Sequence, residues 1–337
     1  MKTRAAYIKA PWECEIRTVE IPDEPPAGRV RIKVDACGLC GTDIATITTG
    51  AKDWQPFGHE IAGTVLAVGP EVYNVKVGDK VALESASSCG VCGPCRDGRN
   101  DICTTMTGFW NRTAMGFSEQ MITPAVSCVP YDSLSAAVAS MAEPSGVAFD
   151  MVKVADIKMG ESVAIVGPGP IALSATALAV HRGAARVTVI GHSHSTARLV
   201  LAKKLGAEAL AIDGDLDKEE SLRRKFNHVL MTAPIKFIAP ALSLLAYEGT
   251  MTYIGIGHDA NAMISFDAND FHFRKLQLRA SFASPARYFP ATLRLLKAGV
   301  LPGTELISHT FTLDQIGDML KLARTDKATT LKLVVTP

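Results

Sequence analysis

The chain has 337 residues, a length that suggests about two domains, because most domains have roughly 100–200 residues. Its 35 Lys and Arg residues almost balance its 34 Asp and Glu residues, so it lacks the basic excess typical of nucleic-acid-binding proteins. With 47% hydrophobic residues it is too apolar to be disordered, and no apolar run reaches the roughly 18 residues of a membrane-spanning helix.

The N-terminal residues Met1–Arg4 lead into a strand-like stretch and not into a signal peptide. We therefore expect a cytoplasmic protein with neither nucleic-acid nor membrane partners. The chain has eight cysteines, four of them within fifteen residues. A secreted disulfide scaffold is usually short and spreads its cysteines along the chain, so this cluster points to a metal.

The N-terminal part, to about residue 150, has a β-rich pattern. Strand-like runs occur at Arg29–Val34, Gly63–Val68 and Lys80–Leu83, separated by Gly and Pro.

From Ser162 onward the pattern changes to alternating strands and helices. The expected strands are Val163–Val166, Arg186–Ile190, Ala209–Ile212, His228–Met231 and Thr250–Ile254, and helices are expected up to Val180 and over Ala197–Leu205. Such alternation predicts an α/β fold with a parallel, doubly wound sheet. A later helix (Ala291–Ala298) and a final strand (Leu331–Val335) do not extend the series, and we expect them to return to the first domain.

The strongest local motif is Cys89-x2-Cys92-x2-Cys95-x7-Cys103. Two-residue gaps let consecutive thiolates face one ion, and four sulfurs around zinc form a closed site that leaves no position for a substrate. We therefore predict a structural zinc. The alternatives are a redox dithiol, chance clustering and an iron–sulfur cluster, although the spacing matches neither common ferredoxin pattern.

A second set of candidate ligands includes Cys40 and the Gly58-His59-Glu60 segment, with His59 nineteen residues after Cys40. A thiolate, an imidazole and carboxylates together suit a catalytic zinc that keeps one position open. Taken alone, His59 could equally be a core or surface residue.

Three segments resemble the zinc-dependent medium-chain alcohol dehydrogenase family. They are Gly58–Gly69, which continues to Val77–Val81, the four-cysteine cluster, and Met141-Ala142-Glu143-Pro144. Sorbitol-type polyol dehydrogenases carry Glu-Pro in the last of these. The resemblance covers essentially the whole chain. It implies a β-rich GroES-like catalytic domain, residues 1–149 and 287–337, and a Rossmann domain, residues 150–286.

The resemblance also implies the roles of several residues. Cys40, His59 and Glu143 would hold a catalytic zinc, and Glu60 would be a fourth ligand or lie just behind the ligands. Such a zinc lowers the pKa of the substrate hydroxyl, and hydride then passes to a nicotinamide. Thr42 matches the hydroxyl that relays the alcohol proton. At Ala45 many relatives have a histidine instead, so the relay here must pass through water, Thr46 or Thr48.

Dinucleotide binding is predicted by a glycine motif that follows a strand and opens a helix. Gly167 permits a tight turn, Gly169 lets the backbone approach the pyrophosphate, and Ala172 replaces the third glycine. With Pro170 and Ile171, these residues would place the pyrophosphate at a helix N-terminus.

The end of the second strand indicates which cofactor is used. NAD enzymes usually have an acid there, whereas this chain has Gly191-His192-Ser193-His194-Ser195, followed by Arg198, Lys203 and Lys204. Hydroxyls, histidine and arginine can receive a 2′-phosphate, so NADP is favoured over NAD. The alternative is that these residues are merely solvated and that NAD binds.

Candidates for the substrate pocket are aromatic residues and their neighbours, although aromatics are more often core: Trp54, Phe57, Phe109, Trp110, Asn111, Arg112 and Phe282. Cys14, Cys37 and Cys128 lack metal spacing and are expected to be small buried hydrophobes. Family analogy predicts a homodimer or homotetramer, with Thr250–Ile256 as an edge strand at the contact.

Together these features predict a zinc-dependent NAD(P)-linked oxidoreductase with two zinc ions per chain. It would interconvert a secondary alcohol, such as a polyol, cyclitol or sugar alcohol, with its ketone. One alternative is a simple secondary-alcohol or threonine-type dehydrogenase. The other is a nucleotide-binding protein with a structural or regulatory role, which would be expected to lack a catalytic ligand.

Overall fold

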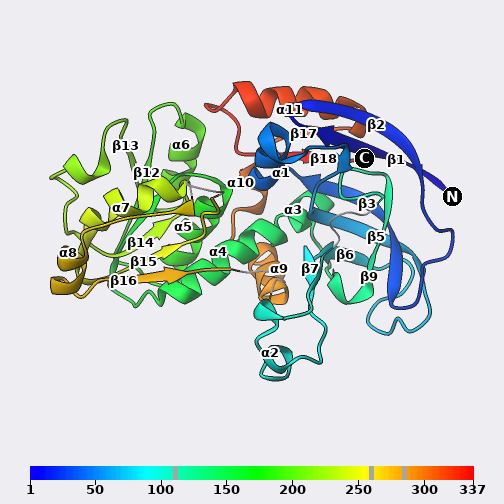
Figure 1. The fold of residues 1–337 in the computed structure, drawn as a ribbon, viewed down its shortest axis with the longest axis horizontal. Helices are drawn as coiled ribbons and strands as arrows, with labels where there is room; N and C mark the ends of the chain where they lie inside the picture. Colours follow the sequence, from blue (N-terminus) through cyan, green and yellow to red (C-terminus); the bar gives the residue numbers. More distant parts are fainter. Residues whose placement is uncertain (109–112, 258–261, 283–286) are drawn as a thin grey trace.

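The computed structural model describes residues 1–108, 113–257, 262–282 and 287–337 (Figure 1). The chain forms two lobes, one built on an antiparallel arrangement and the other on a parallel sheet, with helix α4 (Ala142–Ala155) between them. The chain therefore has the predicted α/β fold, with one β-rich lobe and one lobe built on a parallel sheet. The exact residue bounds of the two domains stay a prediction.

The first lobe contains a three-stranded and a seven-stranded sheet. The three-stranded sheet has the order β2 (Glu13–Glu20), β1 (Lys2–Lys9) and β4 (Gln55–Pro56). The main path of the larger sheet is β10 (Cys128–Pro130), β6 (Lys80–Leu83), β5 (Glu60–Val68), β3 (Arg29–Gly38), β18 (Lys332–Val335) and β17 (Ile307–Phe311), while β9 (Gln120–Pro124) also pairs with β3. The three strands expected here are present.

The end of the chain lies in this larger sheet. Strand β18 pairs antiparallel with β3, and β3 pairs on its other side with β5. In this register Gly38 is opposite Val334 on one side and Glu60 on the other. Residues nearly 300 positions apart in sequence are therefore brought together at the carboxyl end of β3.

The second lobe is a six-stranded parallel sheet. Its order is β13 (Glu208–Ala211), β12 (Arg186–Gly191), β11 (Ser162–Val166), β14 (Phe226–Met231), β15 (Leu245–Tyr253) and β16 (Gln277–Ala280). The helices of this lobe include α5 (Pro170–His181), α6 (Thr196–Lys204), α7 (Ile238–Ala241) and α8 (Ala268–Phe273). The predicted doubly wound arrangement is confirmed.

The expectation that Thr250–Ile256 forms an edge strand is wrong. Strand β15 pairs in parallel with β16, so β16 is the outer strand of the sheet. Strand β16 has only four residues, two of them the polar Gln277 and Arg279, and therefore lacks the apolar run by which a buried parallel strand is recognised.

The remaining elements are short or cover the sheets. They are α1 (Gly41–Ala45), a π-helical turn (Thr46–Gly50), α2 (Gly93–Arg96), α3 (Ala136–Ser140), α9 (Phe289–Lys297), α10 (Gly303–Leu306), α11 (Ile316–Thr325), β7 (Ala86–Ser87) and β8 (Thr107–Gly108), with 3-10 turns at Asn100–Ile102, Ala125–Ser127, Leu216–Lys218, Ile235–Phe237, Leu242–Leu244 and Leu313–Gln315. Helix α2 lies on a loop that projects from the body of the first lobe (Figure 1).

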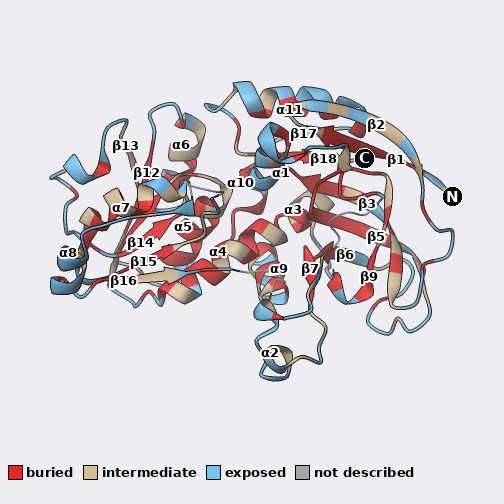
Figure 2. Cartoon of the chain, in the orientation of Figure 1, coloured by how far each residue is buried: buried red, intermediate tan, exposed pale blue. Residues whose placement is uncertain are grey.

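Buried residues line the centre of both lobes (Figure 2). In β3, Val30, Ile32 and Val34 are fully buried and alternate with more exposed residues, as a half-buried strand requires. Helix α4 contacts α5 and β15 on one side and β5 and β6 on the other, so its first turn is held where the two lobes meet. Within the described ranges, no helix combines the length and apolar character needed to cross a membrane.

Candidate active site and metal centres

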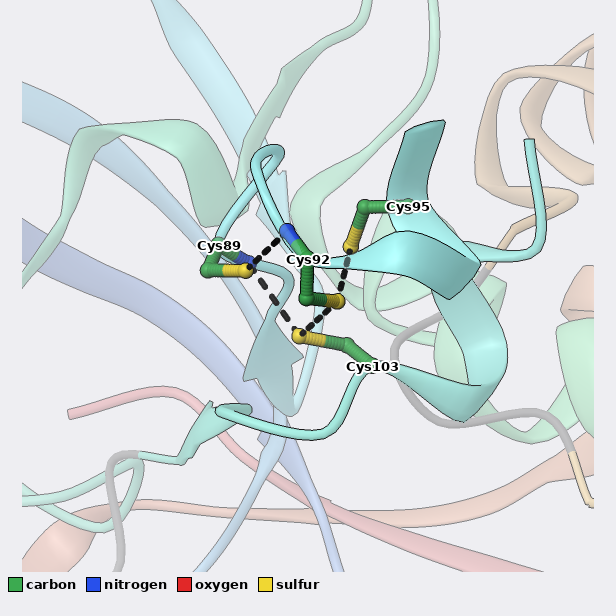
Figure 3. Close-up of side chains that lie close together, drawn as sticks. All are labelled: Cys89, Cys92, Cys95 and Cys103. Atoms are coloured by element: carbon green, nitrogen blue, oxygen red, sulfur yellow. Dashed lines mark hydrogen bonds between the residues drawn. The ribbon is translucent and has the colours of Figure 1, made fainter. Parts of the chain in front are cut away.

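The four clustered cysteines come together on the projecting loop (Figure 3). The Sγ atoms of Cys92 and Cys95 are 3.4 Å apart, and those of Cys92 and Cys103 are 3.8 Å apart. Backbone N–H groups of Cys92 and Cys89 donate to the sulfurs of Cys89 and Cys103, each at 3.3 Å. All four ligand atoms lie within 4.8 Å of one another.

This geometry fits zinc. A tetrahedral ion with Zn–S bonds of about 2.3 Å has sulfurs about 3.8 Å apart, whereas a disulfide brings them to about 2.05 Å. A hydrogen bond from Thr105 and backbone N–H groups lower the pKa of Cys89 to about 5. Burial, followed by the neighbouring Cys92 thiol, raises the pKa of Cys95 to about 12. The four thiols thus share one polar pocket, as ligands to a single cation would.

The second candidate centre lies where β3, β5 and α4 approach one another. Cys40 is the N-cap residue of α1, and its backbone N–H donates to Asp43 Oδ2 at 3.0 Å. His59, directly before β5, is buried, with its Nδ1 3.6 Å from Asp43 Oδ1. Since Nδ1 faces Asp43, Nε2 would be the nitrogen that binds a metal.

Two glutamates complete this cluster. Glu60 is the first residue of β5 and is fully buried, and Glu143 lies in the first turn of α4, where Ser85 hydrogen-bonds it. The charges of Glu60, Cys40 and Glu143 all act on Lys332. The four predicted ligand residues therefore lie near enough to interact electrostatically. A thiolate, an imidazole and carboxylates together form a donor set that suits a divalent metal.

Lys332, the first residue of β18, was not singled out in the sequence. Its buried Nζ lies 2.6 and 2.7 Å from the two carboxylate oxygens of Glu60 and donates to the carbonyl of Leu39 at 3.0 Å. Gly38 makes this pairing possible, since a Cβ there would overlap Glu60 Oε2. The available signal was a lysine within an apolar strand, a position where a buried charge needs a partner.

The charges in this cluster shift one another. Burial alone would lower the pKa of His59, but the nearby Cys40 and Asp43 outweigh it and raise that pKa well above its ordinary value. Burial, and then Glu60, raise the pKa of Glu143, opposed by the positive charges of His59 and Lys332. The cluster is an electrostatically coupled unit of acids and bases.

The predicted proton-relay residues lie on α1 and the π-helical turn. Thr42 is exposed beside Cys40. The Thr46 hydroxyl donates to the carbonyl of Thr42 at 2.8 Å, and the Thr48 hydroxyl donates to that of Ile44 at 2.6 Å. The hydroxyls of Thr46 and Thr48, the two alternative relay groups, therefore both donate their hydrogens to backbone carbonyls. Their oxygen lone pairs remain as acceptors.

The predicted phosphate loop borders a cavity of about 300 Å³ at the end of the parallel sheet. The predicted residues among its lining are Gly167, Gly169, Gly191, His194, Ser195 and Arg198. Gly167 has φ +94°, and a Cβ there would lie 2.9 Å from the backbone nitrogen of Ala233, so this position requires glycine. Gly169 caps α5, whose first turn holds Pro170, Ile171 and Ala172.

Helix α6 separates the predicted basic residues. Lys203 and Lys204 lie in its last turn, outside the cavity lining, whereas Arg198 lies in its first turn and lines the cavity. The backbone of Ser193 faces Asp213, an acid that was not singled out in the sequence. Asp213, two residues after β13, accepts the Ser193 N–H at 2.9 Å and lies 3.4 Å from His192 Nδ1.

This acid lies next to the cavity, between the lining residues Ile212 and Gly214 in the sequence, near the strand end where no acid was expected. The Ser193 backbone N–H, followed by its hydroxyl, lowers the pKa of Asp213, so its carboxylate is charged at neutral pH. The rings of His192 and His194 stack beside it, with centroids 5.3 Å apart. The sequence offered a signal for Asp213, because it follows β13. Neighbouring parallel strands such as β12 and β13 end at the same edge of the sheet.

The candidates for the substrate pocket and the three remaining cysteines have mixed outcomes. Phe57 packs on Phe117 in the core, with centroids 4.5 Å apart. Trp54 is half-buried under Arg17, and Phe282 is 59% exposed. Phe109, Trp110, Asn111 and Arg112 lie outside the described residues. Cys37 and Cys128 are buried as expected, but the expectation for Cys14 is wrong, because it is only half-buried on the outer strand β2.

Two family models match the chain. The Alcohol dehydrogenase GroES-like domain matches residues 26–133, and the Zinc-binding dehydrogenase model matches residues 170–298. An L-threonine 3-dehydrogenase of Bacillus velezensis is 41% identical over 57% of this chain and 56% of its own length. A sorbitol dehydrogenase of Bacillus subtilis is 29% identical over 99% of this chain and 97% of its own length.

Solved structures match over the full chain. One is RspB from Escherichia coli CFT073, in complex with NADH, at 26% identity and a TM-score of 0.88, covering 100% of this chain and 99% of that one. Another is a zinc-binding dehydrogenase from Sinorhizobium meliloti 1021 bound to NADP, at 25% identity and a TM-score of 0.88, covering 100% of both chains. The chain therefore belongs to the zinc-dependent medium-chain dehydrogenase family, whose members matched here include oxidoreductases that act on CH–OH groups.

Proposed function

We propose that this enzyme interconverts a secondary alcohol of a polyol, cyclitol or sugar alcohol with its ketone, using NADP and two zinc ions. One observation carries the proposal. Cys40, His59, Glu60 and Glu143 lie in one charged cluster, with His59 and Glu60 buried, at the junction of two lobes, one of which carries the proposed cofactor cavity.

The residues have distinct roles in this proposal. Cys40, His59 and Glu143 would hold the catalytic metal, with Asp43 fixing the ring of His59 through its Nδ1. Zinc at this position would supply Lewis acidity that lowers the pKa of the substrate hydroxyl. Thr42, exposed beside Cys40, would accept the hydroxyl proton and pass it to solvent or to the acceptor oxygen of Thr46. Glu60, whose carboxylate is bound by Lys332, would be a fourth metal ligand or would lie just behind the ligands.

The second zinc would be held by Cys89, Cys92, Cys95 and Cys103. With four sulfurs it leaves no position for a substrate, so its role is to stabilise the projecting loop. The sulfur spacing in this cluster supports the proposal.

The substrate class follows from the donor set and the relatives. Glu143 as a ligand adds negative charge to the site, and the full-length relative named above is a sorbitol dehydrogenase. A simple secondary-alcohol or threonine-type enzyme is the second candidate, favoured by the partial match to an L-threonine 3-dehydrogenase.

The preference for NADP rests on the lining of the cofactor cavity. His194, Ser195 and Arg198 line it, and all three side chains can donate to a phosphate. Asp213 opposes this preference by its charge, but its carboxylate is already bound by the Ser193 N–H and faces His192. We expect the preference to be moderate for that reason.

We also propose a homo-oligomer and a cytoplasmic location. The outer strand β16 leaves one edge of the parallel sheet without a partner among the described strands, and Phe273, just before it, is 75% exposed. The eight cysteines are free thiols, the state that a reducing compartment maintains.

Turnover of a substrate panel with each cofactor tests this proposal. We expect the highest kcat/KM with a polyol or cyclitol and NADP. Good turnover of 2-butanol or threonine with none of any polyol would establish the second candidate instead. A clear preference for NAD would overturn the cofactor assignment without touching the hydride-transfer chemistry. If the zinc-loaded protein turned over none of these substrates, the proposal that this site is catalytic would be refuted.

A further inference from the structure

Two chain crossings join the lobes. The first is helix α4, and the second is the segment that leads from strand β16 to helix α9. Helices α4 and α9 contact each other and lie side by side between the lobes (Figure 1). Two lobes joined by adjacent crossings can bend where the crossings lie. We call α4 together with residues 281–282 and 287–297 the hinge.

Side chains link the two crossings to each other. Asp150 of α4 is buried, and its Oδ2 accepts the hydroxyl of Ser281, the residue after β16, at 2.6 Å. The backbone N–H of Phe282 also donates to this carboxylate. The ring of Tyr288, the N-cap residue of α9, packs on Phe149 of α4 with centroids 5.0 Å apart. The two crossings therefore form one packed unit.

The projecting loop, residues 89–103, contacts this hinge. Asp101 lies in a 3-10 turn of the loop, two residues before Cys103. Its Oδ1 is 3.6 Å from Nη1 of Arg287, the residue before Tyr288. That oxygen is buried and accepts no hydrogen bond from the described residues, so the guanidinium charge compensates it. The ion pair thus attaches the projecting loop, part of the first lobe, to the second crossing.

A second carboxylate makes this contact depend on its cation. Burial raises the pKa of Asp150, the Ser281 hydroxyl opposes this change, and the nearby charge of Asp101 raises the pKa further. One carboxylate of the projecting loop and one of α4 therefore lie close enough to repel each other. Arg287 offsets this repulsion. Without its charge, the projecting loop and the hinge would repel each other.

We propose that the projecting loop is coupled to cofactor binding through the hinge, with Asp101 and Arg287 as the positioning residues that transmit the coupling. The proposal rests on the proposed function, because it takes the cofactor to bind in the cavity of the second lobe and zinc to hold the loop. The ion pair supports the present angle between the lobes, at which Glu143 of α4 interacts with His59 of the first lobe.

The cofactor would favour the same angle. A nicotinamide that accepts hydride from an alcohol at the catalytic cluster lies between the lobes, because the reacting atoms have to be within about 3–3.5 Å of each other. Such a cofactor binds the angle that brings the cluster and the cofactor cavity together better than other angles, and it increases the population of that angle. The ion pair and the cofactor therefore stabilise one arrangement.

Coupling of this kind is reciprocal. If the projecting loop supports cofactor binding, cofactor binding also restricts the motion of the loop. The described residues that line the cofactor cavity include none from the loop, so this restriction would act at a distance. We expect NADP or NAD, whichever binds more tightly, to slow amide hydrogen exchange in residues 89–103 about threefold.

Calorimetric titration of the zinc-loaded protein with each cofactor, together with hydrogen exchange in the projecting loop, tests the proposal. Arg287→Met should weaken cofactor binding about threefold and abolish the protection of the loop, because Asp101 and Asp150 are left to repel each other. Arg287→Lys should retain most of both effects, since it keeps the positive charge. The matched control is Asp97→Asn, which should leave both measurements unchanged. Asp97 is also two residues from a cysteine of the loop, but its ion pair with Arg99, at 2.9 Å, stays within the loop.

A double variant distinguishes the coupling from general damage. Asp101→Asn with Arg287→Met removes the repulsion together with the ion pair, so it should bind the cofactor better than Arg287→Met alone. Losses of affinity that add in the double variant would refute the proposal. Parent-like affinity and loop protection in Arg287→Met would refute it as well.

The outcomes separate this proposal from the proposed function, because binding and hydrogen exchange require no turnover. A parent protein that protects the loop on binding the cofactor but oxidises no polyol would support the coupling and refute the proposed reaction. A parent protein that oxidises polyols without protecting the loop would refute the coupling and support the reaction. A protein that binds neither cofactor would refute both.

Discussion

Lys332 pairs with Glu60 beside Gly38, the last residue of β3, where a Cβ would overlap the Glu60 carboxylate. Glu60 and Lys332 are both buried, so water does not solvate either charge. The ammonium and the carboxylate neutralise each other instead. A buried pair of this kind adds little stability by itself, but removing one partner leaves an uncompensated charge. The pair therefore fixes where the Glu60 carboxylate lies relative to the metal ligands.

We predict that Lys332→Met destabilises the protein by about 3–5 kcal/mol, because Glu60 is left charged and unpaired. Urea unfolding of the zinc-loaded protein measures this change. The double variant Glu60→Gln with Lys332→Met should recover much of the lost stability, because no unpaired charge remains. Equal stabilities of the single and double variants would show that the pairing has no such role.

The two proposed zinc sites should separate by mutation. Cys40→Ser should lower the zinc content from about two ions per chain to about one and abolish turnover, with the fold intact. Cys92→Ser should also remove about one zinc, but its main effect should be a loss of stability in the projecting loop. Metal analysis, circular dichroism and turnover distinguish the two variants. Full activity in Cys40→Ser would rule out its role as a catalytic ligand.

Asp213 should limit the preference for NADP. Its charged carboxylate accepts the Ser193 N–H and lies next to the cofactor cavity, whose lining includes its chain neighbours Ile212 and Gly214. Asp213→Asn removes this charge, so we expect the ratio of kcat/KM for NADP to that for NAD to rise by about fivefold to tenfold, equivalent to roughly 1 kcal/mol. Glu208→Gln, an exposed acid on the same strand β13, serves as the control. A fall in the ratio would mean that Asp213 instead holds His192 and Ser193 in place for the phosphate.

Glu84 should make stability depend on pH. Burial raises the pKa of its carboxyl from 4.5 to about 8 in the folded protein. The folded state therefore keeps this proton over a range in which the unfolded state has lost it. Stability should fall as the pH rises from about 4.5 to 8 and level off above that range, with a total change on the order of 4 kcal/mol from this group.

Glu84→Gln tests this pH dependence. The variant should be more stable than the parent protein at pH 9 and nearly equal to it at pH 5, since glutamine resembles the protonated acid. Urea midpoints at several pH values measure the difference. Parallel pH curves for the two proteins would exclude Glu84 as the source.

Features that depend only on residues close together in the sequence could be predicted from it. The two-residue gaps of the cysteine cluster place its sulfurs together, because short spacing leaves the chain little choice. The loop of Gly167 and Gly169 was recognised in the same way, because a strand, a tight turn and a helix N-terminus follow one another directly. The strands β3, β11 and β12 were found from their apolar patterns.

Only the tertiary structure decided the contacts between distant segments. The pairing of Lys332 with Glu60 depends on the register of β18, β3 and β5, and the position of Asp213 depends on β13 lying beside β12. Strand β16 was missed because its few residues lack an apolar pattern. Sequence determined the kinds of chemistry this protein carries, because each motif is local. The structure decided which charges face one another, because long-range strand pairing, which no local pattern encodes, brings those residues together.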